Sequence, residues 1–266
     1  MKKWMKFIFW CFLFTGLVII LFLAHKRAAN VALINPEIKI SVAGVDTFLT
    51  QKEVLSRLKT HQIFEKGREA SSLDVYKTEA TLDSMPEVRN VEVYKGLKGV
   101  WSIDLELVKP LARIFPEGQQ SFYLDADGNK MKRSSIHTAR VPIFSGLIPD
   151  RIDSENVGLI INNDSLKSIR LLDDIYRISN YVCKDPLLQS LIGQVYCDEN
   201  HDFIMIPVVG KQRIVFGKAS SVKEVEDKFQ RLKVFYQEAM PYEGWNKYKE
   251  ISLKNFCLVT PLGNFH

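Results

Sequence analysis

Cysteine is scarce in this chain, with four residues in a total of 266. Cys11 lies within an apolar run, and Cys183, Cys197 and Cys257 form an odd set, so the sequence predicts no complete disulfide framework. A disulfide bond between Cys183 and Cys197 remains an alternative, although the pattern favours buried free thiols. The sequence also has no low-complexity linker and no repeat. Its composition, 46% hydrophobic and 25% charged residues, is typical of a folded protein.

The short motifs that mark common enzymes are also missing. No G-x-S-x-G, H-E-x-x-H or G-x-G-x-x-G pattern occurs, and the five histidines have no carboxylate or cysteine partner at a familiar spacing. The Gly217-Lys218 pair is followed by alanine where a phosphate-binding loop has Ser or Thr. The sequence therefore predicts no catalytic residue, no cofactor and no small-molecule substrate.

Two segments have a superficial likeness to metal sites. Residues 125–129 read DADGN, but an EF-hand loop has its glycine at position six and here it stands fourth, so a tight turn is favoured over a calcium loop. Cys197 and His201 have no second ligand pair at zinc spacing, which favours a strand cysteine and a loop histidine. We therefore expect no metal site.

Positive charge is concentrated at the N-terminus. Lys2, Lys3, Lys6, Lys26 and Arg27 account for the whole formal net charge of +5, and no acid lies among them. The rest of the chain is close to neutral, which argues against nucleic-acid binding because that function requires a basic surface. The basic residues instead flank an apolar run, where they match lipid headgroups.

The apolar run extends from Phe7 to Ala24 without a charged residue. Its length is near that of a helix that crosses a bilayer, and Trp4 and Trp10 lie where aromatic rings favour the membrane interface. The run is longer than the core of a cleaved signal peptide, and basic residues follow it directly, so an anchor is favoured over a signal. Three lysines precede the run and Lys26-Arg27 follow it, which favours a cytoplasmic N-terminus.

The first folded block predicts the element order β-α-α-β-β. Thr50 and Glu53 form a capping box that starts one helix, and Asp74 can cap a second helix, which Pro86 ends. Alternating apolar and polar residues indicate the strands. The strands are expected at 38–42, 88–93 and 101–107.

The second folded block predicts a mixed sheet with two helices on one face. One helix is expected at 165–183, and the capping box Ser221-x-x-Glu224 starts the other. Packing of this last helix onto the last strands is favoured over a ligand platform for Tyr236, Tyr242, Trp245 and Tyr248. Strands are expected at 111–115, 122–124, near Lys130, 141–147, 192–197, 203–207, 213–216, 250–253 and 256–260.

These segments define the predicted organisation of the chain. The fold class is α+β, with one N-terminal transmembrane helix, a small β-α-α-β-β domain and a mixed β-sheet domain with two packed helices. The expected boundaries are a cytoplasmic tail at 1–6, the transmembrane helix at 7–24, a spacer at 25–36, and domains at 37–110 and 111–266.

Several segments, in this order and spacing, resemble the bacterial cell division protein FtsQ (DivIB) family. Residues 85–114 read MPEVRNVEVYKGLKGVWSIDLELVKPLARI and are similar to the end of the POTRA domain of that family. Residues 141–147, VPIFSGL, resemble its P-x-hydrophobic-x-G segment, and GWNKY from Gly244 with EISLKN from Glu250 resembles the end of its β domain. The penultimate strand departs from the family's Asp-Leu-Arg pattern and reads Ser252-Leu253-Lys254.

The resemblance implies a non-catalytic scaffold of the division machinery in the cell inner (cytoplasmic) membrane at the septum, with residues 7–24 in lipid and most of the chain extracytoplasmic. The implied partners are FtsB/FtsL or DivIC-like proteins and FtsW/FtsI-like proteins. Strand addition at the C-terminal edge of the β domain is the implied mode of binding. The implied partner-binding residues are Lys254, Asn255, Phe256, Cys257, Leu258, Val259 and Thr260.

Other readings remain open from the sequence. The strand at 38–42 is a candidate second edge for partner binding. A membrane-anchored envelope enzyme is one alternative function, and it requires carboxylates or a nucleophile–base pair brought together only by folding. A POTRA-type assembly or chaperone module is the other alternative.

Overall fold

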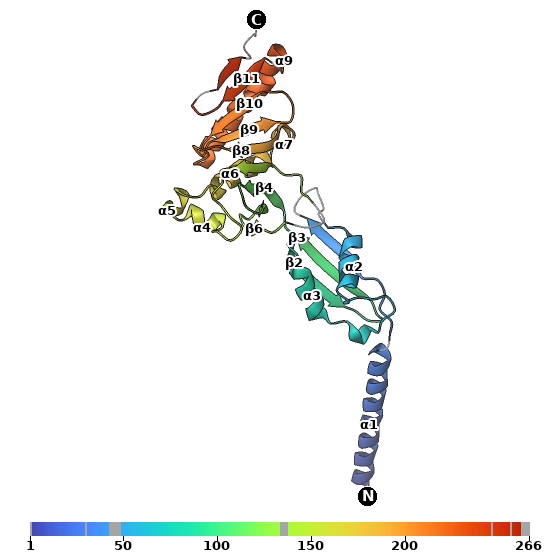
Figure 1. Cartoon of the computed structure of the whole chain (residues 1–266). Helices are drawn as coiled ribbons and strands as arrows, with labels where there is room; N and C mark the ends of the chain where they lie inside the picture. Colours follow the sequence, from blue (N-terminus) through green and yellow to red (C-terminus); the bar gives the residue numbers. More distant parts are fainter. Residues whose placement is uncertain are drawn as a thin grey trace. The chain divides into compact units, whose positions relative to one another are not determined.

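The computed structural model of the chain folds as two compact units, Met1–Leu107 and Val108–His266 (Figure 1). Each unit has its own hydrophobic core. The structure describes residues 2–29, 31–42, 49–133, 138–245, 247–255 and 257–261.

The chain begins with helix α1, Lys2–Ala29. The large apolar side chains from Ile8 to Leu23 are all exposed. Among the residues that the structure describes, no helix is both long enough and apolar enough to cross a membrane. The predicted bilayer span at 7–24 is therefore not confirmed and stays a prediction.

The rest of the first unit has the predicted β-α-α-β-β order. Thr50 Oγ1 accepts from the Glu53 N–H at 3.3 Å, and Asp74 Oδ1 accepts from the Lys77 N–H at 3.0 Å, so both predicted helix caps form. The sheet order is β1-β3-β2, with β1 parallel and β2 antiparallel to β3. The elements are β1 (Glu37–Val42), α2 (Gln51–Thr60), the 3₁₀ turn η1 (Ala70–Ser72), α3 (Val75–Asp83), β2 (Val88–Lys95) and β3 (Trp101–Leu107).

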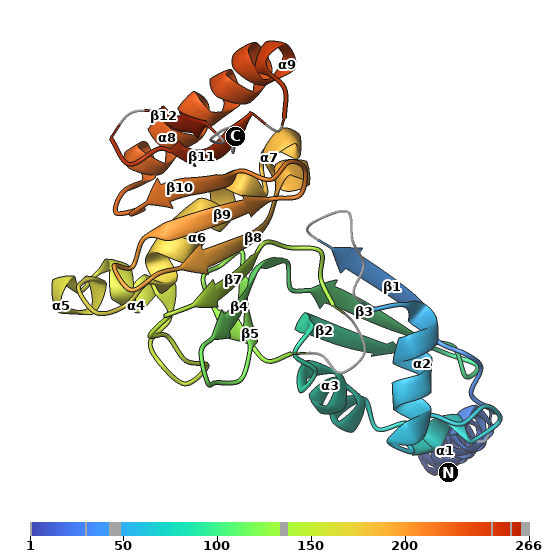
Figure 2. The same ribbon diagram turned by 45° about the horizontal axis from the view of Figure 1, so that its top comes forward.

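Helices α2 and α3 cover one face of this sheet (Figure 2). The alternation in β3 puts Trp101, Ile103 and Leu105 into the core, each at most 1% exposed. Leu58 of α2 and Leu82 of α3 are buried in the same cluster. The period-two pattern of the sequence thus corresponds to a half-buried strand, as predicted.

The second unit contains one nine-stranded mixed sheet, in the order β12-β11-β10-β9-β8-β7-β4-β5-β6. Its first strands are β4 (Pro110–Pro116), β5 (Phe122–Asp125), β6 (Lys130–Met131) and β7 (Ile143–Gly146). The later strands are β8 (Ile192–Cys197), β9 (Phe203–Pro207), β10 (Arg213–Gly217), β11 (Tyr248–Ser252) and β12 (Leu258–Pro261).

The two long helices of the second unit, α6 (Leu172–Val182) and α8 (Val222–Val234), bury their apolar stripes in one core with the sheet. Phe229 of α8 lies 4.9 Å from Phe216 of β10 and 5.0 Å from Tyr181 of α6, measured between ring centroids. The predicted α+β class, with a mixed sheet and packed helices, is confirmed.

The single helix predicted at 165–183 is wrong. The structure has α5 (Asp164–Lys167) and then α6, separated by a bend, because the Leu171 N–H donates to Oδ2 of the buried Asp150 at 2.9 Å and starts α6 anew. The Arg170 side chain turns away to Glu155 and to the Pro149 carbonyl. Three short helices are absent from the predicted elements: α4 (Val157–Ile161), α7 (Pro186–Leu191) and α9 (Met240–Glu243).

Candidate functional site

Strand β12 lies at one end of the nine-stranded sheet, next to β11 (Figure 2). The two strands are antiparallel, with Ser252 opposite Leu258 and Ile251 opposite Val259. Among the described residues, the structure therefore places the last strand at a sheet edge. The strand begins later than predicted, at Leu258, and extends to Pro261.

The backbone of β11 shows which groups face β12. The Leu253 N–H donates to the Val215 carbonyl of β10 at 2.8 Å, so Leu253 and Ile251 direct their backbone groups toward β10. Successive residues of a strand direct these groups to opposite sides. Glu250 and Ser252 therefore direct their N–H and C=O groups toward β12.

The same alternation decides which groups of β12 face outward. Leu258 and Thr260 lie opposite Ser252 and Glu250, so their backbone groups complete the ladder with β11. Val259 lies opposite Ile251, and its N–H and C=O point away from β11. Pro261 has no N–H. Val259 is thus the residue of β12 that presents both a backbone donor and an acceptor at the edge.

The side chains of β12 reach both faces of the sheet. Val259 lies opposite the fully buried Ile251, which places it on the core side, and it is 38% exposed. Leu258 lies opposite Ser252 on the other face and is 62% exposed. An added strand would therefore have an apolar neighbour on each face of the sheet.

The predicted partner-binding residues Lys254 and Asn255 lie in the turn before β12, not in the strand. Lys254 pairs with Asp202, and this hydrogen bond raises the pKa of Lys254. Arg231 Nη1 of α8 donates to the Asn255 carbonyl at 2.8 Å. These two contacts tie the turn to Asp202 and to α8, and both Lys254 and Asn255 remain exposed.

The remaining predicted positions lie on either side of the strand start. Cys257 is half-buried against the core, and burial raises the pKa of its thiol. Thr260 is exposed. Phe256 lies outside the described residues. Partner binding by Lys254–Thr260 stays a prediction, with Leu258, Val259 and Thr260 as its strand residues.

Both outer strands of the three-stranded sheet in the first unit have an outward group bonded to a helix side chain. Glu79 Oε1 of α3 accepts from the Val93 N–H of β2 at 2.9 Å. Gln51 Nε2 of α2 donates to the Ile38 carbonyl of β1 at 2.7 Å. The candidate second edge at 38–42 is therefore already partly occupied.

The aromatic residues near the C-terminus pack between the last helices and the last strands. Tyr236 and Trp245 have ring centroids 5.7 Å apart, and Phe235 and Tyr248 have theirs 5.6 Å apart. The favoured packing role is confirmed for Tyr236 and Tyr248, whereas Trp245 is 42% exposed and Tyr242 is fully at the surface. A π-helical turn at Phe235–Ala239 (η2), absent from the predicted elements, extends α8.

The residues considered for metal binding have structural roles. Asp125 Oδ1 accepts from the N–H groups of Asp127 at 2.9 Å and Asn129 at 2.7 Å, so DADGN forms the favoured tight turn. Burial raises the pKa of Cys197 to about 12, and this residue lies in β8 while His201 follows in a loop. All four cysteines are free thiols.

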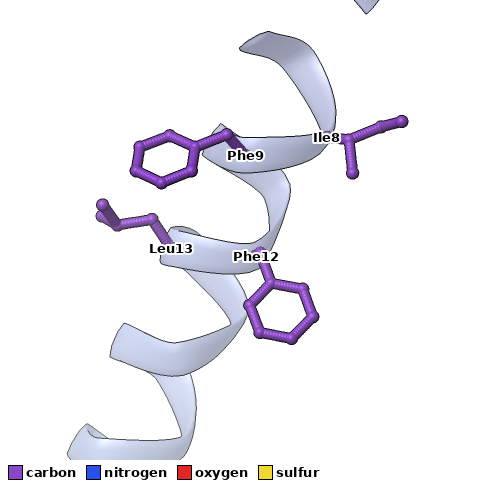
Figure 3. Close-up of a pocket in the computed structure, with 4 residues that line it drawn as sticks. All are labelled: Ile8, Phe9, Phe12 and Leu13. Carbon is purple, nitrogen blue, oxygen red and sulfur yellow. The ribbon is translucent and has the colours of Figure 1, made fainter. Parts of the chain in front are cut away.

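Groups of acidic, histidine and cysteine side chains that could hold a metal ion are absent from the described part of the chain. A hollow on the surface of α1 is lined by Ile8, Phe9, Phe12 and Leu13 (Figure 3). Phe9 and Leu13 project from one side of the helix in this view, and all four side chains are apolar. The hollow therefore offers no group that could act as an acid, a base or a nucleophile.

Two family models match the chain. The model described as FtsQ/DivIB, C-terminal related, matches residues 109–256, which is more than half of the chain, and the model described as POTRA-like domain matches residues 35–106. A search of the curated proteins found no match. FtsQ/DivIB proteins are membrane-anchored cell division proteins, and both matched domain types are non-enzymatic scaffold modules. Because the first model matches more than half of the chain, this chain belongs to the FtsQ/DivIB family.

Proposed function

We propose that this protein is a non-catalytic, membrane-anchored scaffold of the division machinery that binds a partner by adding the partner's strand to β12. The observation that carries this proposal is the outward direction of the Val259 N–H and C=O at the end of the nine-stranded sheet. Strand addition satisfies such groups with backbone hydrogen bonds, while neighbouring side chains provide specificity.

The two apolar residues of β12 support this mode of binding. A partner side chain beside Leu258 would cover apolar surface on the open face, and one beside Val259 would extend the core face. In contrast, the edges of the first unit already give Val93 and Ile38 a helix side chain as a partner. The edge at β12 is therefore a better site for an added strand than either edge of the first unit.

Helix α1 is the proposed anchor. Its exposed apolar side chains between Ile8 and Leu23 suit a lipid environment, and the cytoplasmic tail would be residues 1–6. With the N-terminus in the cytoplasm, the domains at 37–110 and 111–266 would lie outside the inner membrane, at the division septum. The proposed partners are FtsB/FtsL or DivIC-like proteins, with a link to FtsW/FtsI-like proteins of wall synthesis.

The test compares two substitutions at Val259 in the full chain. Val259→Pro removes the outward N–H and leaves the ladder to β11 intact, whereas the matched control Val259→Ala keeps that N–H. Loss of one interfacial backbone hydrogen bond, with its partner carbonyl left unpaired, costs about 1–2 kcal/mol and weakens binding roughly 5–30-fold. Pull-down and titration with FtsB/FtsL-type partners would measure the difference.

The position of the proline matters for this test. Leu258→Pro would remove a donor to Ser252 and disturb β12 itself, so it cannot separate binding from folding. Circular dichroism and amide exchange of the inner strands would verify that both Val259 variants are folded. Equal affinity of Val259→Pro and Val259→Ala for the partner would rule out strand addition at this edge.

A further inference from the structure

The turn between β2 and β3 presents an exposed apolar side chain between two lysines. Leu97 is 82% exposed at its tip, and Lys95 and Lys98 on either side are exposed as well. The Gly96 N–H donates to the Val100 carbonyl at 2.9 Å and closes the hairpin. A single exposed leucine is common on a protein surface, but Leu97 lies in the same turn as Val100, 47% exposed, and the turn is bonded to Ile34, also 47% exposed, so the exposed apolar side chains here form a group.

This turn is bound to the segment that follows α1. The Ile34 N–H donates to the Gly99 carbonyl at 3.2 Å, and Trp101 Nε1 donates to the Ile34 carbonyl at 2.8 Å. A Cβ atom on Gly99 would lie 2.2 Å from the Ala32 carbonyl oxygen, so the two backbones are in direct contact. The position of the turn relative to residues 32–34 is therefore fixed by the fold.

A second loop holds the same segment from its other side. The Ala70 N–H donates to the Val31 carbonyl at 2.8 Å, the Leu33 N–H donates to the Arg68 carbonyl at 2.7 Å, and the Gly67 N–H donates to the Leu33 carbonyl at 3.2 Å. Residues 31–34 thus lie between two surface loops, as part of the folded unit.

Chain length places these loops close to the end of α1. Ala29 ends the helix two residues before Val31, which allows a separation of at most about 8 Å between their Cα atoms. Leu23 is the last residue of α1 whose side chain the structure describes as exposed, and the six helical steps from Leu23 to Ala29 cover roughly 9 Å. The headgroup layer beyond each side of the hydrocarbon core is about 5–8 Å thick. In a chain anchored by α1, Ala29 would therefore lie at about the outer surface of this layer, and residues 31–34 would begin within about 8 Å of it.

Charge favours contact with a negatively charged lipid surface. At residues 65–70 and 95–98, the exposed basic residues outnumber the exposed acids, and each cation near an anionic leaflet is attracted to it. The basic residues are Lys66, Arg68, Lys95 and Lys98, and the acids are Glu65 and Glu69.

We propose that the Gly96–Val100 turn inserts Leu97 into the headgroup layer of an anionic bilayer, with Lys95 and Lys98 bound to lipid phosphates. This proposal rests on the proposed anchoring of the chain by α1. The contact would hold the POTRA-like unit close to the membrane surface at a second point besides the anchor.

The experiment uses the full chain in vesicles of phosphatidylcholine and phosphatidylglycerol that carry a nitroxide in the headgroup region. A fluorescent coumarin amino acid replaces Leu97 in one sample and Asn90, an exposed residue at the other end of β2, in the control. The two positions are roughly 23 Å apart along the strand. We expect several-fold stronger quenching at position 97, and weaker quenching after Lys95→Glu with Lys98→Glu or without phosphatidylglycerol.

The outcomes separate this proposal from the anchor itself. Retention of the chain by vesicles during an alkaline wash tests α1, and loss of retention would overturn both proposals. A retained chain with equal quenching at positions 97 and 90 would overturn only the insertion of Leu97. An emission shift at position 97 without quenching would mean that Leu97 contacts protein, and would overturn it too.

Discussion

The turn between β11 and β12 is held by two basic side chains, and their removal should loosen β12 without unfolding the sheet. Arg231 of α8 donates to the Asn255 carbonyl, and Lys254 pairs with Asp202. The perturbation is the double variant Arg231→Met, Lys254→Met, in which both side chains keep an unbranched apolar chain but lose their charge and their donors.

The magnitude follows from the exposure of the two contacts. The Arg231 hydrogen bond to Asn255, 2.8 Å long at an exposed site, contributes about 0.5–1.5 kcal/mol. The Lys254 side chain is 48% exposed, so its ion pair with Asp202 is partly screened and contributes about 0.2–1 kcal/mol. The opening of β12 should therefore become easier by about 1–2 kcal/mol, or roughly 5–30-fold.

Amide hydrogen exchange measures this opening directly. The N–H groups of Leu258 and Thr260 face β11, so their exchange in the double variant should accelerate by that factor. Amides of Val195 in β8 should exchange at the wild-type rate. The matched control is Lys223→Met, an exposed position on α8. Exchange of Leu258 and Thr260 at the wild-type rate in the double variant would refute the claim that these contacts hold the edge.

Three further predictions concern other parts of the fold. Glu79→Ala should accelerate hydrogen exchange of the Val93 amide up to about tenfold, because this N–H loses its acceptor. Glu79→Gln keeps an oxygen at that position and should not accelerate it. Equal exchange rates in the two variants would contradict the role of Glu79. Burial raises the pKa of Asp150, so the folded state favours its protonated form. The free energy of unfolding of the wild type, relative to that of Asp150→Asn, should therefore be greatest at acid pH and fall as the pH rises through the raised pKa. Urea unfolding at several pH values measures this dependence, and a difference that does not change with pH would exclude it. Trp101→Phe should destabilise the first unit by about 1–3 kcal/mol in thermal unfolding because the Ile34 carbonyl loses its donor, and an unchanged midpoint would count against that bond.

Local patterns in the sequence were sufficient to predict most elements. The capping boxes at Thr50 and Ser221 are satisfied by backbone groups three residues away, so they depend little on the rest of the fold. The alternation at 101–107 likewise needs only one buried face. The order of elements in the first unit was predictable for the same reason.

The errors arose where a distant residue decides the local conformation. The apolar periodicity at 165–183 is continuous, but the buried Asp150, from an earlier loop, accepts the Leu171 N–H and divides the helix. A side chain that caps a helix from a distant part of the sequence leaves no pattern within the helical segment itself, so the break could not be predicted from that segment. The short helix α7, by contrast, has a signal that was overlooked, since Asp185 caps it and Pro186 occupies its first turn.

The candidate site was predictable in composition but not in detail. The apolar segment at the end of the chain indicated a strand, and the family resemblance indicated its role. Which residue faces outward depends on the Leu253 hydrogen bond to Val215 in β10, about forty positions earlier in the chain. For the same reason, the sequence could not separate Lys254 and Asn255, which hold the turn, from Val259, which presents its backbone at the edge.

The edge strands of the two units differ in a way that bears on partner length. An unprotected edge invites uncontrolled pairing, and natural proteins limit it with charge, proline or a covering side chain. The first unit uses Glu79 and Gln51 for this purpose. At β12 the pairing is limited by Pro261, which has no N–H. The stretch that can both donate and accept hydrogen bonds with an added strand is therefore centred on Val259. A partner strand bound here would form only a few backbone hydrogen bonds, and its affinity would have to come from side chains placed beside Leu258 on the open face and Val259 on the core face.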